Sequence, residues 1–151
     1  MKRALVASIL TVMVLVAGFA HVETAEASMA AYDAYLHDSN IKIKQTMKAG
    51  QKYRVSVKVQ NSGDIKWEGR RFRLHSRIHK GPSGSSMQRD ELTPIIYLKG
   101  VLHTGEWYTF YYDVEAPAYT GKYTLEWTMM RGSSNFGDLG TLPAFFLPSS
   151  S

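Results

Sequence analysis

The sequence contains no cysteine, and this absence excludes several classes of protein at once. Without thiols the chain forms no disulfide framework, holds no iron–sulfur cluster or cysteine-ligated zinc, and offers no thiol nucleophile. It also lacks the residue that carries the lipid of a lipoprotein. Charged residues make up 21% and hydrophobic residues 44% of the 151 positions, which is typical of a globular chain, and the length predicts one domain.

Long apolar runs are scarce as well. The chain has a single one, residues 4–19, which is shorter than the ~20 residues of a membrane-spanning helix. Two cations precede it and the small-x-small pattern of residues 25–27 follows it, so residues 1–27 are predicted to be a secretory signal peptide. We expect cleavage after Ala27, with Ala20 as second choice and an uncleaved anchor as the alternative. The mature chain should then be secreted, without a transmembrane segment. The absence of cysteine and of Asn-x-Ser/Thr sequons fits a bacterial source.

Acidic residues are rare in one part of the chain. Between Lys42 and Lys80 there are twelve lysines and arginines but only Asp64 and Glu68 to oppose them, although the whole chain carries a net charge of only +5. The molecule is therefore expected to be electrically polarised, with one basic sheet or edge. Such a field favours anionic partners and makes their binding sensitive to salt.

The dominant pattern along the chain has a period of two. In residues 52–59, for example, apolar Val55 and Val57 alternate with cationic and polar side chains, as in a strand with one buried face. Alternation of this kind, or enrichment in aromatic and β-branched residues, predicts strands within residues 41–44, 52–59, 71–79, 106–114 and 122–129. Turn signals separate these runs, and residues 135–138 are interpreted as a structural turn rather than a calcium loop. The pattern predicts an all-β sandwich.

Several short motifs, taken in order, suggest a family. Asn61-Ser62-Gly63 follows a glycine turn and a strand and precedes Trp67; further on come Ala116-Pro117, Gly121–Trp127 and Phe136-Gly137-Asp138. Residues 40–148 thereby resemble the FW ("four-tryptophan") domain, a module of autophagy cargo receptors and of bacterial secreted proteins. The resemblance implies an immunoglobulin-like antiparallel β-sandwich of about seven to eight strands that binds without catalysis. Only Trp67 and Trp127 occupy family tryptophan positions, so the fold carries over better than any ligand pocket.

The resemblance also divides the chain into parts. Residues 28–39 would be an N-terminal lead-in to the sandwich at residues 40–148, and residues 149–151 a frayed tail. The inward positions of the strands, together with the two family tryptophans, give a predicted core: Trp67, Trp127, Tyr123, Val55, Val57 and Leu125.

The basic strand at residues 71–79 is the best functional lead in the sequence. By alternation, its cations and histidines share one face, and cations of neighbouring strands could join them if those strands lie in the same sheet. The candidate ligand-binding residues are Arg71, Arg73, Arg77, His75, Lys42, Lys44, Arg54 and Lys58. The alternative is a solvated face that deters edge-to-edge aggregation. As a binding surface, it would suit an anionic polysaccharide, a wall polymer or an extracellular protein, because guanidinium groups pair with phosphate and carboxylate.

Aromatic residues occupy both faces of the strand at residues 106–114. Tyr108, Phe110 and Tyr112 share one face, and Trp107 and Tyr111 share the other. One face must fill the core. We expect the second face to be covered as well; the alternative is an exposed surface for sugar or peptide.

No catalytic or metal site emerges from the sequence, and no cofactor is implied. His75 and His79 would stand about 13 Å apart on a strand, too far for one zinc ion. No cluster of inward-pointing acids supports a hydrolase. The sequence therefore favours a secreted binding module with a basic sheet. The alternative is a protein–protein module that uses strand edges or aromatic surface.

Overall fold

The computed structural model describes residues 31–81 and 95–149 of the chain. The predicted signal peptide, the start of the lead-in and the last two residues lie outside the described ranges, as does the segment 82–94. The described residues form strands and two 3₁₀ turns, with these bounds: β1 Ala34–Tyr35, η1 Asp38–Asn40, β2 Ile41–Lys42, β3 Thr46–Lys48, β4 Lys52–Asn61, β5 Trp67–Glu68, η2 Gly69–Arg71, β6 Phe72–Lys80, β7 Ile96–Tyr97, β8 Val101–Leu102, β9 Trp107–Glu115, β10 Gly121–Arg131 and β11 Ser134–Leu147. None of the helical turns in these ranges is long and apolar enough to cross a membrane.

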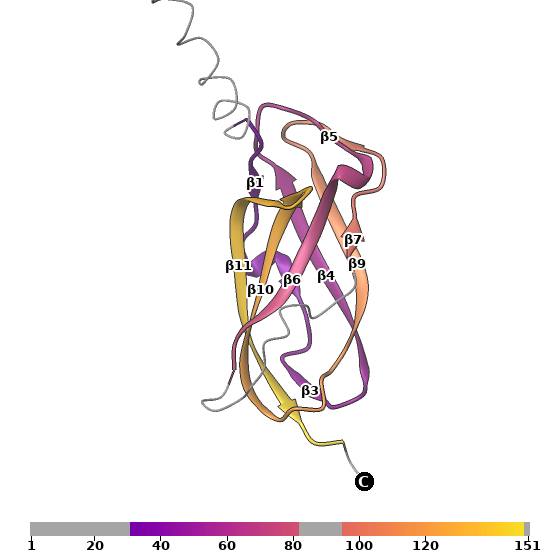
Figure 1. The fold of residues 1–151 in the computed structure, drawn as a ribbon, viewed down its shortest axis with the longest axis vertical. Coiled ribbons are helices and arrows are strands. Elements are labelled where there is room, and N and C mark those ends of the chain that lie inside the picture. The colour runs from indigo at the N-terminus through magenta and orange to yellow at the C-terminus, as the bar shows by residue number, and fades with distance from the viewer. Residues whose placement is uncertain (1–30, 82–94, 150–151) are drawn as a thin grey trace, which may run out of the picture. The chain divides into compact units, whose positions relative to one another are not determined.

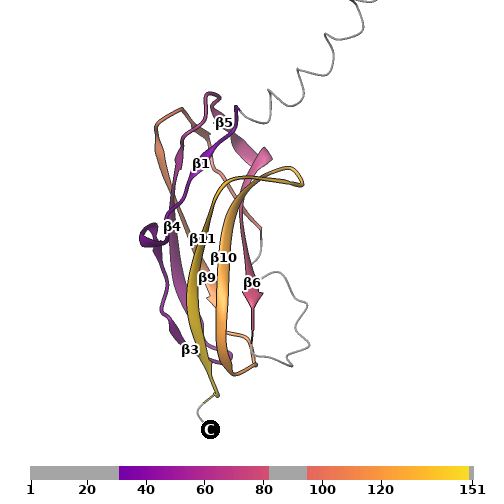
Figure 2. The same ribbon diagram turned by 90° about the vertical axis from the view of Figure 1, so that its left-hand side faces the viewer.

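Two sheets form the sandwich, and β5 and β8 form a small third sheet of their own; Figure 1 shows β5 at one end of the described strands. Sheet A contains β4 at its centre, with β1 and β2 along one edge and β9 along the other. Sheet B has the order β3-β11-β10-β6-β7. Neighbouring strands are antiparallel except β3, which runs parallel to β11. Figure 2 shows β4 and β6 on opposite sides of the molecule, so the chain is an all-β, immunoglobulin-like sandwich.

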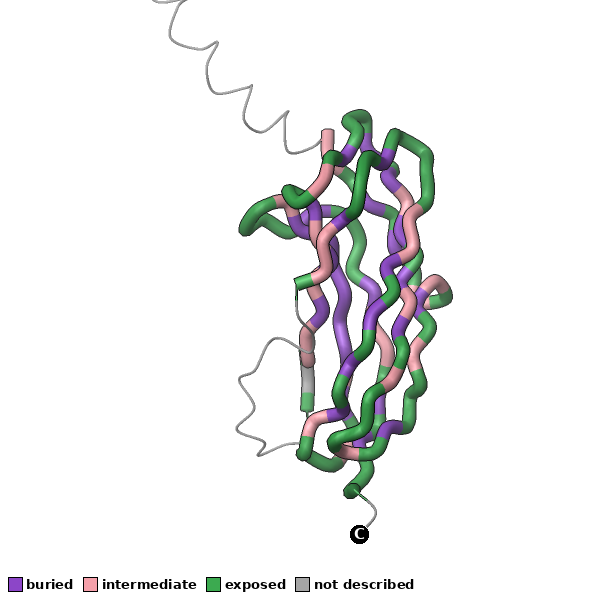
Figure 3. The backbone as a smooth tube through the Cα atoms, turned by 90° about the vertical axis from the view of Figure 1, so that its right-hand side faces the viewer, coloured by how far each residue is buried: buried purple, intermediate pink, exposed green. Residues whose placement is uncertain are grey.

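The core lies between the sheets because β4 and β9 bury alternate residues, while β10 is buried at every position from 125 to 130. In β4, Val55, Val57 and Val59 are fully buried, whereas Lys52, Arg54 and Lys58 on the opposite face of the strand are exposed. Figure 3 shows this alternation along several strands. All six residues predicted for the core are buried: Trp67, Trp127, Tyr123, Val55, Val57 and Leu125. The strands predicted from alternation correspond to β2, β4, β6, β9 and β10.

The interpretation of residues 135–138 as a turn is wrong, because they lie inside β11. The chain instead reverses just before them, where Arg131 pairs with Ser134. Glycines at 137 and 140 interrupt the alternation that would have indicated a strand, and the ladder with β10 is irregular there. Gly137 has φ 74°, and a Cβ at this position would stand 2.5 Å from the Cβ of Ala34 in β1. The glycine therefore allows β1 to cross close to β11.

The sandwich also begins before residue 40, because β1 pairs with the end of β4. Two carboxylates fix this lead-in against β11. Asp138 Oδ2 accepts a hydrogen bond from the Leu36 amide at 3.3 Å, and Asp38 Oδ1 accepts one from the Thr141 amide at 2.8 Å. The segment predicted as a lead-in is thus partly an element of sheet A.

The Asn-x-Gly motif has a structural cause. Asn61 is fully buried, and its Nδ2 donates hydrogen bonds to the carbonyls of Ile65 and Leu102, both at 3.0 Å, while its Oδ1 accepts from the Gly63 amide. One side chain therefore satisfies backbone hydrogen-bonding groups both in the turn after β4 and at the end of β8. A Cβ on Gly63 would stand 2.4 Å from the carbonyl oxygen of Ala31, so glycine is needed where the turn meets the N-terminal segment.

Tyr112 forms hydrogen bonds across the core, from sheet A to sheet B. Trp127 Nε1 in β10 donates to the hydroxyl of Tyr112 in β9 at 2.6 Å, and the side chain of Ser76 also hydrogen-bonds this phenol. Tyr112 is only 6% exposed. Burial raises the pKa of Tyr112 to about 12, although its hydrogen bonds oppose the rise, because the phenolate loses the solvation that water gives it.

This pKa predicts a loss of stability at alkaline pH. A folded-state pKa above the unfolded value of about 10 contributes stability that is complete below pH 10 and is lost as pH rises through about 12. We expect wild type to lose about 2–3 kcal/mol of unfolding free energy over this window that Tyr112→Phe does not lose. At pH 7 the variant should be less stable by about 1–3 kcal/mol, because the Trp127 indole N–H is left unpaired. Urea unfolding from pH 7 to 12 measures both effects, and a stability difference that stays constant with pH would contradict the prediction.

Candidate functional site

The predicted basic residues do not form one surface. Lys42, Arg54 and Lys58 lie on β2 and β4 in sheet A, whereas Arg73 and Arg77 lie on β6 in sheet B. Because the two sheets face each other across the core, the side chains that point outward from them lie on opposite faces of the sandwich. Arg71 is not in the strand at all; it ends η2, before β6 begins.

The cations of β6 are partly neutralised by a carboxylate that the sequence analysis did not single out. Glu126, opposite Arg77 in the β10–β6 ladder, has a side chain only 5% exposed. Its Oε1 lies 2.6 Å from both Nε and Nη2 of Arg77, and its Oε2 lies 3.4 Å from Nδ1 of His79. Arg77 thus pairs with a buried charge. His75 and Arg73 are half-buried beside Thr128 and Met130 of β10.

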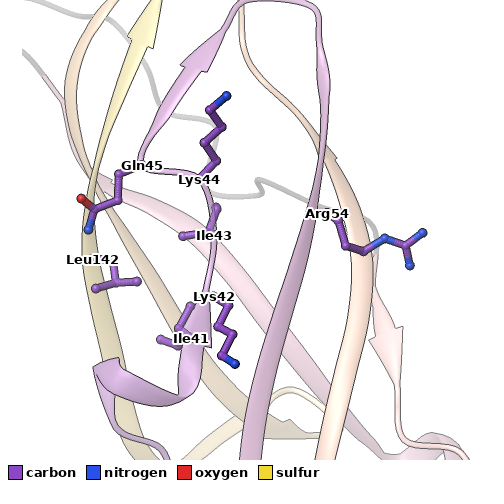
Figure 4. Close-up of a pocket in the computed structure, with 7 residues that line it drawn as sticks. All are labelled: Ile41, Lys42, Ile43, Lys44, Gln45, Arg54 and Leu142. Carbon is purple, nitrogen blue, oxygen red and sulfur yellow. The ribbon is translucent and has the colours of Figure 1, made fainter.

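Sheet A holds the other group of cations, beside a shallow groove. The groove has a volume of about 490 Å³ and lies where the chain passes from β2 in sheet A toward β3 in sheet B (Figure 4). Its lining residues, here named the cationic groove, are Ile41, Lys42, Ile43, Lys44, Gln45, Arg54 and Leu142. Three of the seven are cations and none is acidic. The isoleucines and Leu142 supply the apolar part of the lining.

The cations of this groove differ in how they are paired. Arg54 Nε lies 2.8 Å from Asp113 Oδ1 on β9, and both side chains are half exposed or more, so water weakens this ion pair. Lys42 and Lys44 form no ion pair with any described residue; Lys44 Nζ lies 5.7 Å from the ring centroid of Tyr53. The ammonium groups of Lys42 and Lys44 are therefore the groove charges most available to an incoming anion.

The second aromatic face of β9 is exposed, contrary to expectation. Tyr108, Phe110 and Tyr112 point into the core or toward it, as one face must. On the outer face, Trp107 is 41% and Tyr111 65% exposed. The expectation of a cover failed because no strand of the described chain packs over the outer face of sheet A.

Trp107 has two neighbours that the sequence did not indicate. Tyr35 in β1 meets it edge to face, with ring centroids 5.9 Å apart, and Lys58 Nζ lies 4.8 Å from its ring centroid. Tyr35 is isolated in the sequence, and only the pairing of both Tyr35 and Trp107 with Gln60 of β4 brings the two rings together.

In the described residues, no group of three His, Asp or Glu side chains could hold a metal ion.

Comparison with known proteins agrees with this architecture. A family model described as the Ig-like domain from next to BRCA1 gene matches residues 40–140. The crystal structure of the CARDB domain of a Pyrococcus furiosus protein, in complex with di-metal ions, is similar in fold: the TM-score is 0.52, the identity 14%, and the match covers 77% of this chain and 89% of that one. A solution structure of the same domain gives a TM-score of 0.50, at 14% identity over 79% and 98% of the two chains. No curated protein sequence matches the chain.

The pairing of Arg77 with Glu126 predicts which cation of β6 the fold requires. Arg77→Ala leaves the Glu126 carboxylate buried without its arginine and should lower the unfolding free energy by about 1–3 kcal/mol. Arg73→Ala, on the same face of the same strand and without an ion pair among the described residues, should change it by less than about 0.5 kcal/mol. Chemical denaturation measures both. Equal stability of the two variants would show that the Glu126 pair is not structural.

Proposed function

The chain belongs to the family described as "Ig-like domain from next to BRCA1 gene", and we propose that it is a non-catalytic binding module for an anionic polymer. The observation that carries the proposal is the cationic groove, whose lining combines Lys42, Lys44 and Arg54 with no acidic residue. Ig-like sandwiches host many functions, so the family supports binding in general and the groove supports the kind of ligand.

The groove suits a flexible chain of charges better than a compact small molecule. It is shallow and open, and its two lysines project from the segment of β2 and residues 43–45 that joins the sheets (Figure 4). An open site gives little shape discrimination, so binding would depend on charge. Exposed ammonium groups attract anions over about 8–10 Å at moderate salt, and a polymer can engage several of them in sequence.

The face of β6, which the sequence favoured, supports this function less well. Arg77 already has Glu126 as its partner, and Arg71 lies outside the strand. Of the three arginines that define the predicted face, Arg73 is the one that remains on the strand without an ion pair among the described residues. We therefore place the binding surface on sheet A.

A second candidate function is protein–protein interaction through a strand edge. Within the described residues β9 pairs with β4 alone, so its other edge presents backbone groups along nine residues. Such an edge can accept a strand from a partner. The narrower resemblance to the FW module, with two of its four tryptophans in place, points to the same kind of function.

We also propose that the protein is exported. The support is the cationic start, the single apolar run and the small-x-small pattern within residues 1–27. Intact-mass analysis of culture supernatant should find a chain that begins at Ser28. Recovery of the uncleaved chain in the membrane fraction would instead favour the N-terminal anchor.

Reversing the groove charges tests the binding function. The double variant Lys42→Glu, Lys44→Glu should weaken retention on immobilised inorganic polyphosphate at low salt by at least about tenfold, because two attractive charges become repulsive. The matched control is Arg71→Glu, Arg73→Glu, which reverses the same number of charges in η2 and β6 and should retain binding. Wild-type retention should fall steeply as salt rises.

Two other results would change the interpretation. Loss of binding in the control alone would return the site to the β6 face. Binding by both variants as tight as that of wild type would instead favour the second candidate function, a protein partner at the β9 edge. Circular dichroism and thermal melting of each variant show whether a loss reflects unfolding rather than the changed charge.

A further inference from the structure

Three exposed aromatic rings lie along the outer face of sheet A, next to the cationic groove. They are Tyr35 of β1 and Trp107 and Tyr111 of β9, here named the aromatic strip, with 42%, 41% and 65% of their surfaces exposed. Trp107 and Tyr111 point to the same side of one strand and are separated by about 13 Å along it. Large aromatic surfaces left in water in a row are uncommon on a chain that has a filled core, and they mark interaction sites.

The strip is held in place by its neighbours. Tyr35 and Trp107 meet at 90° over Gln60, whose own Nε2 donates to the carbonyl of Gly105 at 2.9 Å. The ammonium group of Lys58 stands over the Trp107 ring and so brings a positive charge into the strip. All of these side chains project from a hydrogen-bonded sheet, so the rings present a preformed surface that binding does not have to order.

Polar groups lie between the rings, and charges lie at their side. Thr109 stands between Trp107 and Tyr111 on β9, opposite Lys58. Tyr111 is opposite Ser56, and Ser56 is opposite Lys42 of the cationic groove. Lys42 and Tyr111 are therefore two strands apart, about 10 Å. One continuous face therefore carries rings, hydroxyl groups and two lysines that form no ion pair with a described residue.

We propose that the anionic polymer is an acidic polysaccharide, and that Trp107 and Tyr111 stack on its sugar rings while Lys42 and Lys58 pair with its carboxylate or sulfate groups. This inference rests on the proposed function and specifies its ligand. The apolar C–H face of a pyranose packs on the face of an aromatic ring, and the hydroxyl groups of Ser56 and Thr109 can exchange hydrogen bonds with those of the sugar.

The combination of groups favours this class of ligand over others. A ring-free polyanion such as polyphosphate would use the lysines but gain nothing from the rings. A neutral glycan would use the rings but leave the lysines without partners. Single-stranded DNA stacks its bases and carries charge, but it has no hydroxyl groups along its backbone that could exchange hydrogen bonds with Thr109 and Ser56.

The test compares three polymers with variants of the full chain. Binding of polygalacturonate, inorganic polyphosphate and oligo(dT) is measured by calorimetry at low salt. Trp107→Ala and Tyr111→Ala should each weaken polygalacturonate binding by about tenfold, while polyphosphate binding stays within about twofold of wild type because no charge changes. Tyr111→Phe keeps the ring and should recover most of the affinity. Tyr119→Ala removes an aromatic ring of similar exposure, 45%, from the β9–β10 connection and should have no effect.

The possible outcomes distinguish a wrong assignment of the ligand from a failure of the proposed binding function. If polygalacturonate binds the alanine variants as tightly as wild type, the stacking proposal is overturned, and the groove remains a polyanion site. If the variants lose oligo(dT) more strongly than polygalacturonate, the ligand is a nucleic acid and the saccharide assignment is wrong. If wild type binds none of the three polymers, the proposed function itself fails. Thermal melting of each variant, with wild-type-like transitions expected, confirms that the exposed rings are not needed for folding.

Discussion

The structure depends on one constraint: β4 and β10 must bury one face each against the other sheet. β4 supplies valines from sheet A, and β10 supplies Tyr123, Leu125 and Trp127 from sheet B. Because successive side chains of a strand point to opposite sides, this burial decides the orientation of every other residue on both strands. The register of β9 and β6 follows, since each pairs directly with one of the two central strands.

The same constraint separates the charges of the molecule. Cations of β4 point out of one face and cations of β6 point out of the other, so a cluster in the sequence becomes two surfaces in space. The surfaces are not equivalent. On sheet B a nearly buried carboxylate, Glu126, holds Arg77, and this pair belongs to the structure of the sheet. On sheet A the one ion pair, between Arg54 and Asp113, is exposed, and Lys42 and Lys58 have no acidic partner among the described residues.

The outer face of sheet A shows how a core can position a binding surface. Tyr112 faces inward and accepts the hydrogen bond of Trp127, which fixes β9 to the opposite sheet. Because successive side chains of a strand point to opposite faces, its neighbour Tyr111 must then point outward, even though its ring is large and partly apolar. The exposed rings of Trp107 and Tyr111 are thus supported by the same strand whose inner face forms the Tyr112–Trp127 hydrogen bond, and rigid support of this kind favours binding by a preformed surface.

Much of the fold was present in the sequence, because alternation is a local signal. Residues 52–59 and 122–129 alternate without interruption, and their strands and core-facing residues could be predicted from them. The same applies to the Asn61-Ser62-Gly63 turn, whose residue types already restrict the backbone. The burial of Glu126 and Thr128, on the outward positions of β10, could not be predicted from alternation. β11 could not be predicted in this way, since Gly137 and Gly140 break its alternation and serve contacts with residues about a hundred positions away.

The candidate site was decided by tertiary structure. The sequence determined that the chain is basic, rich in strands and aromatic on both faces of β9. It did not determine which strands share a sheet, and that choice places Lys42 and Tyr111 on either side of Ser56, Tyr35 against Trp107, and Glu126 against Arg77. Side-chain pairing across strands depends on register between distant segments, and register is fixed by the shared core rather than by any local pattern of residues.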